Sequence, residues 1–256
     1  MNIRNQIIAN SIIHHGKWDD IYWAIENKQV LDDKQVEEIC SKIKCGVVTI
    51  LDEDYPLYLR ECYHPPFVLF YYGDISLIKD YRKNIAVVGS RKVSLKGLSN
   101  TDKVVQGIAK KLNVVSGLAK GVDRQAHLSA IKAGGKTIAV LGSGIDLCYP
   151  SCNEDLYEEI KKNHLLISEY YNHEPPDQDH FPFRNRLISI FSNSALIPEA
   201  HFLSGTSITA SYTLSFGRTI FAMPSNDLEH SLCNSLIKDG AILVTNSEDI
   251  LYELGV

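Results

Sequence analysis

The chain has 256 residues, 45% of them hydrophobic and 22% charged, which is enough to bury a sizeable core in one large domain or in a large domain with a small companion. Its apolar runs have the length of strands, and residues 7–13 are interrupted by polar side chains, so the sequence predicts no membrane-spanning helix and no signal peptide and indicates a cytoplasmic protein. Its net charge of −5 argues against nonspecific binding of nucleic acid by the whole surface, and its six cysteines lack the paired spacing of a zinc site.

Residues 1–45 predict a small helical domain, because apolar residues such as Val36, Ile39 and Ile43 recur at helical spacing. Residues 46–256 are predicted to form the larger domain. It opens with a short strand at 46–50, a turn, and a second strand at 67–73.

From residue 85 onward, short apolar runs alternate with longer segments of helical spacing. This alternation predicts an α/β fold with right-handed crossovers and a mostly parallel sheet that carries helices on both faces. The predicted strands are residues 85–89, 113–116, 137–141, 165–168, 194–198, 219–222 and 241–244. The predicted helices are residues 97–111, 122–133, 153–162, 184–192, 206–216 and 231–239.

Four of these strands are followed by turns rich in glycine and serine, which parallel geometry places at one edge of the sheet. Small residues let main-chain N–H groups and helix N-termini approach an oxyanion, so we expect this edge to bind phosphate. Arg91 adds a fork of donors suited to phosphate. The turns are Gly89-Ser90-Arg91, Ser116-Gly117 with Lys120-Gly121, Gly142-Ser143-Gly144, and Ser204-Gly205-Thr206.

Charge is distributed unevenly along the chain. Residues 82–136 carry twelve lysines and arginines against two aspartates, a net charge of +10, whereas residues 1–81 carry eight cations against thirteen anions and residues 187–256 carry two against seven. A basic segment around the predicted phosphate-binding turns favours a polyanionic ligand.

The turns do not match the loops that bind common nucleotide cofactors. None has the Lys followed by Ser or Thr of a Walker A loop, and Gly142-Ser143-Gly144 lacks the third glycine of the dinucleotide fingerprint, so no cofactor is predicted. Asp123 and His127 are spaced to form a base on a helix, although a helix N-cap with a packed histidine is the favoured interpretation. Asp146 is expected to shape its turn, and the sequence shows no nucleophile elbow or metal-binding carboxylate cluster.

Aromatic and cationic residues lie close together around the start of the predicted helix 184–192. Rings can stack on splayed bases, at about 1–3 kcal/mol per base, while guanidinium groups hold the backbone of a single strand. The alternative is that the rings belong to the core, and we expect this of one of the two. The residues are Phe181, Phe183, Arg184, Asn185 and Arg186.

With these motifs in order from about residue 85 to residue 250, the chain resembles the DprA/Smf family (DNA processing protein A), cytosolic bacterial proteins that bind single-stranded DNA. Weaker similarity extends back through Tyr55-Pro56-Leu57 to Gly73. The matching motifs are Val88-Gly89-Ser90-Arg91, residues 116–123 with His127, residues 135–146, Tyr149-Pro150, Ser168-Glu169, Phe181-Pro182 with residues 184–186, Glu199-Ala200, Ser204-Gly205, Gly217-Arg218, and Leu236-Ile237 with Gly240-Ala241.

The resemblance implies an extended Rossmann-like domain that performs no catalysis and needs no cofactor. It implies a homodimer that shields incoming single-stranded DNA during natural transformation and helps to load a RecA-type recombinase. By position, Arg91 resembles a phosphate clamp and Phe181 a base-stacking ring, and Leu214 and Leu236 fall where family members dimerise, close to the expected recombinase contact.

The chain also departs from the family pattern. Ser151 and Gln178 stand where many members carry a cation, which removes two expected phosphate contacts; Pro224-Ser225 replaces a Pro-Gly, and no C-terminal winged helix is expected. The alternative function is a mononucleotide-binding or nucleotide-hydrolysing protein on the same kind of sheet. Ser204-Gly205-Thr206 argues against it, because the glutamate that follows the related hydrolase loop is missing.

Overall fold

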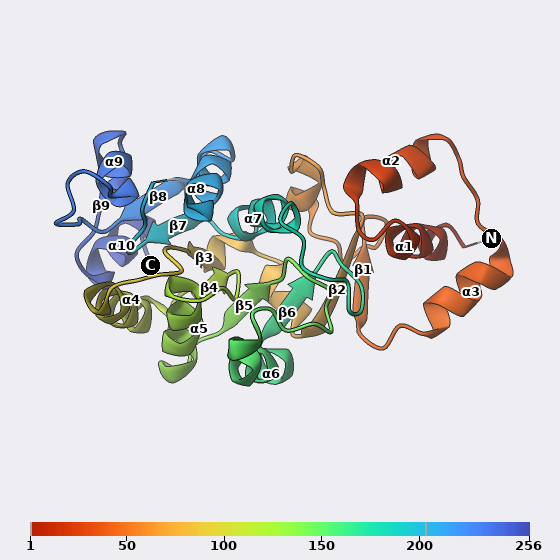
Figure 1. Ribbon diagram of the computed structural model, residues 1–256, viewed down its shortest axis with the longest axis horizontal. Helices are drawn as coiled ribbons and strands as arrows, with labels where there is room; N and C mark the ends of the chain where they lie inside the picture. The colour runs from red at the N-terminus through yellow and green to blue at the C-terminus, as the bar shows by residue number, and fades with distance from the viewer. Residues whose placement is uncertain (1, 203) are drawn as a thin grey trace.

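A nine-stranded sheet runs across the molecule (Figure 1). This computed structural model describes residues 2–202 and 204–256, and the strand count refers to that part of the chain. The strand order is β1-β2-β6-β5-β4-β3-β7-β8-β9. The bounds are β1 Gly46–Thr49, β2 Val68–Gly73, β3 Asn84–Val87, β4 Asn113–Ser116, β5 Thr137–Val140, β6 Leu165–Ser168, β7 Ser194–Ile197, β8 Thr219–Ala222 and β9 Ile242–Leu243.

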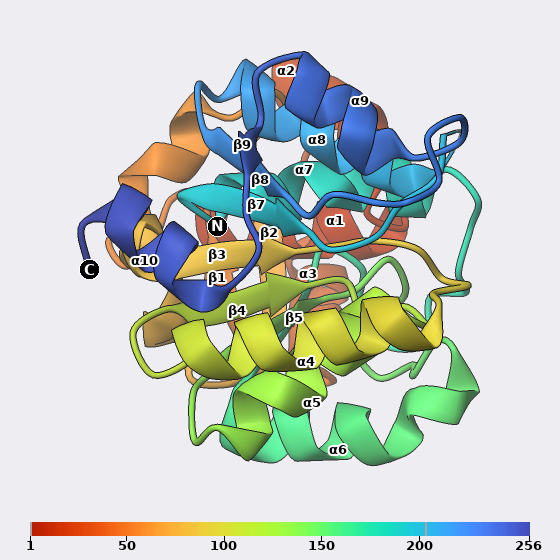
Figure 2. The ribbon, with the colours of Figure 1, turned by 90° about the vertical axis from the view of Figure 1, so that its left-hand side faces the viewer.

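Helices cover both faces of this sheet. In Figure 2, α4, α5 and α6 lie below the strands, and α7, α8 and α9 lie above them. Helix α10 joins the α4 side, since Ile250 shares a buried cluster with Val104 and Val105. The bounds are α4 Leu95–Ile108, α5 Val122–Lys132, α6 Glu154–Asn163, α7 His180–Ile190, α8 Gly205–Ser215, α9 Leu232–Lys238 and α10 Ser247–Leu254. This arrangement confirms the predicted α/β class with a mostly parallel sheet.

The inner strands β3, β5, β6 and β7 are buried from end to end, which explains why their sequences are unbroken apolar runs. The predicted strands are confirmed with small shifts at their ends. Two features were not predicted. Strands β1 and β2 extend the sheet beyond β6 as antiparallel strands, and α10 follows β9 with a capping box between Asn246 and Asp249.

Helix α7 begins at His180, so the predicted start at residue 184 is wrong. Pro182 fits the first turn because main-chain N–H groups there have no partner within the helix. Phe181 therefore lies on the first turn of α7, at the carboxyl edge of the parallel strands.

The direction of strand order reverses at β3, which pairs with β4 on one side and β7 on the other. Sheets of this class bind ligands beyond the carboxyl ends of the strands at such a reversal. The turn containing Arg91 leaves the sheet at this point.

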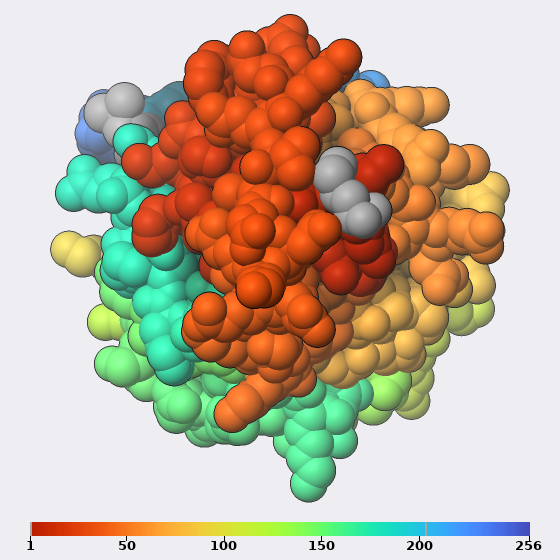
Figure 3. Space-filling model, turned by 90° about the vertical axis from the view of Figure 1, so that its right-hand side faces the viewer, coloured from red at the N-terminus to blue at the C-terminus, as the bar shows by residue number. Residues whose placement is uncertain are grey.

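The first 45 residues contain α1 Ile3–Ile13, α2 Trp18–Glu26 and α3 Asp33–Ser41, which cover the β1 end of the molecule (Figure 3). Short 3-10 helices connect later elements at Leu57–Glu61, Ile75–Ile78, Tyr81–Lys83 and Ser151–Asn153. Ile7 and Ile8 of α1 share a buried cluster with Phe70 of β2. The helical content predicted for residues 1–45 is confirmed, and their folding as a separate domain stays a prediction.

Candidate nucleic-acid interface

Arg91 and Phe181 meet at the carboxyl edge of the sheet, although ninety positions separate them in the sequence. The guanidinium carbon of Arg91 lies 5.7 Å from the centroid of the Phe181 ring. Arg91 is exposed, and its side chain has no hydrogen-bond or ion-pair partner among residues 2–202 and 204–256. The structure thus brings together the two residues that the resemblance assigned to phosphate and base.

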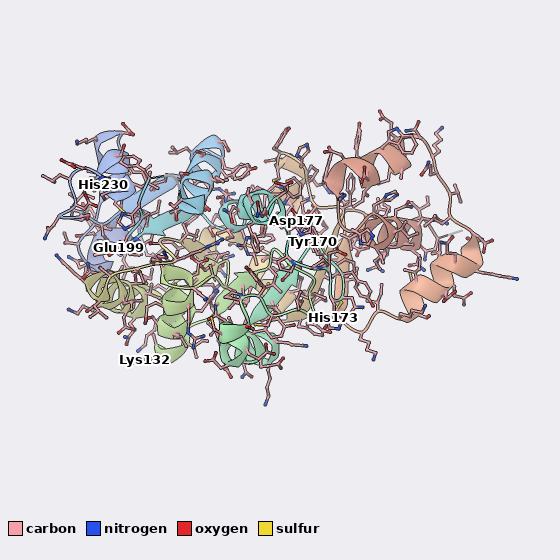
Figure 4. All side chains as sticks on the ribbon, in the orientation of Figure 1. Lys132, Tyr170, His173, Asp177, Glu199 and His230 are labelled. Atoms are coloured by element: carbon pink, nitrogen blue, oxygen red, sulfur yellow. The ribbon has the colours of Figure 1, made fainter. Side chains whose placement is uncertain are left out.

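The turn that carries Arg91 is held from the side of β7. The main-chain N–H of Ser90 donates to the carbonyl of Glu199 at 2.8 Å. The Glu199 carboxylate, labelled in Figure 4, accepts the main-chain N–H of Ser94 at 2.7 Å. Both ends of the turn are therefore fixed, and Arg91 lies exposed between them.

Gly142 lies against the Phe181 ring. A Cβ atom at Gly142 would lie 2.8 Å from a ring carbon, closer than real contacts allow. A Cβ atom at Gly117 would likewise lie 2.5 Å from a guanidinium nitrogen of Arg184. These two glycines are required because protein side chains pack against them. The sequence predicted a different reason, the close approach of a ligand.

Tyr149 is a residue of this edge that sequence reasoning did not assign to the site. It is 46% exposed, and its ring centroid lies 5.5 Å from that of Phe181 at an interplanar angle of 33°. Its place in the Tyr149-Pro150 motif, directly after the Gly142 turn, was the available signal. Phe181 therefore lies close to both Arg91 and a second aromatic ring.

The serine hydroxyls of the predicted turns point into the protein. Ser90 donates to the carbonyl of Lys92 at 2.9 Å, and Ser116 donates to the carbonyl of Val87 at 2.7 Å. Ser143 donates at 3.1 Å to a carbonyl of its own turn. Each of these hydroxyls thus satisfies a main-chain acceptor of its own or a neighbouring segment, and the binding of phosphate by the main-chain N–H groups of these turns stays a prediction.

Arg184 is only 5% exposed and lies beneath the turns that follow β4 and β5. Its guanidinium donates to the carbonyls of Gly117, at 3.0 Å, and Val140. Burial lowers its pKa to about 10, although nearby Asp123 favours the charged form. The prediction that Arg184 faces DNA is corrected, since this side chain joins two turns from below.

Arg186 is fully buried and forms a two-armed ion pair with Glu169, with both N–O distances at 2.6 Å. Burial opposes its charge, but Glu169 outweighs burial and raises the pKa of Arg186. Phe183 lies under the same guanidinium at 3.8 Å. Asn185, also buried, donates to the carbonyl of Gly205 at 3.2 Å. The predicted DNA contacts of Arg186 and Asn185 are therefore replaced by contacts within the protein.

Ser204 and Gly205 form the start of α8. A Cβ atom at Gly205 would meet no atom within 4 Å, and this glycine is exposed. The Ser204 hydroxyl makes no helix cap and has no partner among residues 2–202 and 204–256. This turn is the open one of the four.

The basic segment is divided between two edges of the sheet. Lys132, at the outer end of α5 in Figure 4, and Lys136, which precedes β5, lie toward the amino edge. Arg124 pairs with Asp155 at 2.7 Å. Lys120 is exposed and has no partner within the described chain, so its ammonium group is free to assist Arg91.

The Asp123–His127 pair is buried beneath the site. His127 bonds to the Thr137 hydroxyl at 2.6 Å, and burial lowers its pKa to about 3. Asp123 accepts the main-chain N–H of Gly117 at 3.1 Å, and burial raises its pKa. The packed-histidine interpretation is confirmed, but the helix N-cap is Gly121 rather than Asp123. Asp146, expected to shape its turn, instead accepts the Tyr72 hydroxyl at 2.8 Å.

A cavity of about 640 Å³ lies between the loop before α2 and the segment that leads into α7. Tyr170 and Asp177 on its wall are labelled in Figure 4. This cavity adjoins the start of α7, but its carboxylates would repel phosphate, so it does not suit a DNA backbone. The carboxylates belong to Asp19, Asp20, Glu174, Asp177 and Asp179.

The two residues predicted for a dimer surface differ in exposure. Leu214 on α8 is 58% exposed, whereas Leu236 on α9 is partly buried against the core beneath α7.

Within residues 2–202 and 204–256, no helix has the length and apolar character needed to cross a membrane, and no group of three metal-ligating side chains lies close enough together to hold a metal ion.

Three comparisons relate the chain to known proteins. The family described as "DNA recombination-mediator protein A" matches residues 46–255. The chain is 44% identical over 207 residues to "DNA processing protein DprA" of Streptococcus pneumoniae, a match that covers 80% of this chain and 73% of that protein.

Two solved structures share its fold. The X-ray structure of DNA processing protein A from Streptococcus pneumoniae superposes with a TM-score of 0.79 and 37% identity, covering 97% of this chain and 93% of that one. DNA processing protein A from Helicobacter pylori, whose structure is described as giving insight into its single-stranded DNA binding mode, gives a TM-score of 0.75 and 28% identity over 84% of this chain and 97% of that one.

Proposed function

The chain belongs to the DNA recombination-mediator protein A family, and from this premise we propose that it binds single-stranded DNA at the carboxyl edge of its parallel strands. We further propose that the bound strand is protected and passed to a RecA-type recombinase during natural transformation. The observation that carries the proposal is the contact between Arg91 and Phe181, a cation without a partner in the described chain lying over an aromatic ring.

This contact suits one nucleotide. The guanidinium offers several donors to a phosphate, while the ring offers a face to an unstacked base. In the free protein Arg91 lies over the ring, so it must move aside for a base to stack. Because nothing else in the described chain holds Arg91, this movement breaks no hydrogen bond or ion pair.

The other proposed contacts surround this pair. Lys120 supplies a second cation, and the start of α8 at Ser204-Gly205 supplies main-chain donors. The protein acts by binding, without catalysis or a cofactor, in the cytoplasm. Two copies associate through a surface that includes exposed Leu214, near the contact with the recombinase.

A length series separates strand binding from nucleotide binding. Affinity is measured for thymidine monophosphate and for oligothymidylates of increasing length at low salt. We expect affinity to rise with length and then level off, because successive phosphates and bases add contacts. Affinity that is already saturated by the mononucleotide would contradict the proposal and support the mononucleotide-binding alternative.

A further inference from the structure

We propose that Tyr149 and Lys120 form a second nucleotide-binding position beside Phe181, in which an unstacked base lies on the Tyr149 ring and its phosphate meets the Lys120 ammonium. This inference rests on the proposed binding of single-stranded DNA and adds the residues that would hold a neighbouring nucleotide. It assigns a role to an exposed ring that the fold itself does not use, and it pairs this ring with the cation already proposed to contact the strand.

The Tyr149 ring is open to solvent in a way that packing alone does not require. It is 46% exposed, its hydroxyl has no hydrogen-bond partner in the described chain, and its ring contact is with Phe181 at 5.5 Å. Ser151 and Gln178 nearby are exposed and uncharged. Ser151 and Gln178 therefore offer no cation here, which leaves stacking on the ring and the Lys120 ammonium as the contacts for a strand.

The segment before Tyr149 is held by main-chain hydrogen bonds to the segment after β6. Gly144 donates to the carbonyl of Glu174 at 2.8 Å, and Ile145 donates to the carbonyl of Tyr170 at 3.0 Å. Tyr170 is the labelled residue at the centre of Figure 4. The backbone that leads to Tyr149 is thus held in place before a base arrives, which lowers the entropy lost on binding.

The segment after Tyr149 is tied to the turn that carries Lys120. Asn153 donates its main-chain N–H to the carbonyl of Pro150 at 3.0 Å, and its side-chain amide to the carbonyl of Leu118 at 2.8 Å. The Tyr149 loop and the Lys120 turn therefore form one connected surface. A base on the ring would place its phosphate next to a cation that has no partner in the described chain.

A base-stacking contact and a phosphate contact differ in their dependence on salt. Replacing Tyr149→Ala is expected to weaken binding of an oligothymidylate by between about fivefold and about 150-fold, the equivalent of stacking one base, without changing the slope of log K against log salt. Replacing Lys120→Ala is expected to reduce that slope by about 0.7, as for one phosphate contact of a single strand.

Two further measurements separate stacking from a purely structural role of the ring. Tyr149→Phe should bind within twofold of the unmodified protein, and Tyr252→Ala, which removes an 89% exposed ring on α10, should do the same. On an abasic strand of equal length, Tyr149→Ala and the unmodified protein should bind equally, because no base remains to stack.

The outcomes separate this inference from the proposed function. If Phe181→Ala weakens binding while Tyr149→Ala stays within twofold, the second position is wrong and the first stands. If Tyr149→Phe loses as much affinity as Tyr149→Ala, or if Tyr149→Ala weakens abasic binding equally, stacking is wrong. An unmodified protein that binds no oligonucleotide overturns both.

Discussion

Arg91, Arg184 and Arg186 differ in what surrounds each guanidinium group. Arg91 is exposed without a partner in the described chain, Arg184 is buried against main-chain carbonyls, and Arg186 is buried against Glu169. The sequence predicted a cationic cluster but could not separate these roles, because the partners come from distant strands and turns. Only the tertiary structure determines which cation faces solvent.

Substitution of Gly142 tests whether DNA binding depends on the position of the Phe181 ring. Replacing Gly142→Ala places a Cβ atom 2.8 Å from the Phe181 ring and should displace the ring. We expect affinity for a single-stranded oligonucleotide to fall about tenfold, roughly the loss of one stacked base. Gly205→Ala, where the added atom meets nothing within 4 Å, serves as the control for thermal stability. Unchanged DNA binding by a folded Gly142→Ala protein would show that the ring position is unimportant.

At the scale of elements, the ion pair between Arg186 of α7 and Glu169 after β6 connects the helix that carries Phe181 to the sheet. Replacing Arg186→Met leaves a buried carboxylate without its partner, which should lower the free energy of unfolding by about 3–5 kcal/mol. Urea denaturation measures this change. The exposed pair Arg82–Asp80 gives the matched control, since Arg82→Met should change stability little. Equal effects of the two substitutions would contradict the structural role of Arg186.

The helices and strands show which features of the fold could be predicted from the sequence. The buried strands were predicted because full burial on both faces produces unbroken apolar runs, as in β3. The start of α7 was predicted four residues late, and the structure places Pro182 within the first turn, which accepts proline. The pairing of β1 and β2 beyond β6 could not be predicted, since strand partners depend on contacts across the whole chain.

In the folded molecule, the cations that are concentrated in residues 82–136 of the sequence lie at two different edges of the sheet. Helices run opposite to the parallel strands, so cations between a helix and the next strand fall at the amino edge, as Lys110, Lys111 and Lys136 do. Arg91 and Lys120 fall at the carboxyl edge. The net charge of +10 over residues 82–136 therefore overstates the charge available to one DNA groove.

The buried histidine beneath the site predicts how stability depends on pH. His127 has a pKa lowered to about 3, so between pH 6.5 and pH 3 the unfolded chain takes up a proton that the folded chain does not. Stability should therefore fall as pH drops through that range, by about 2 kcal/mol from this residue at pH 5. Urea denaturation at pH 7 and pH 5 measures the loss. A His127→Gln protein should lose less stability over the same step, and an equal loss would assign the effect to other groups.

The most direct test of the DNA-binding site compares Arg91→Ala with Lys110→Ala. Lys110 is exposed near the end of α4, toward the amino edge of the sheet. Affinity for one oligothymidylate is measured at several salt concentrations, with circular dichroism to confirm folding. Arg91→Ala is expected to weaken binding and to reduce the slope of log K against log salt by about 0.7, while Lys110→Ala should change neither. Equal effects of the two substitutions would show that the strand is not held at Arg91 and Phe181.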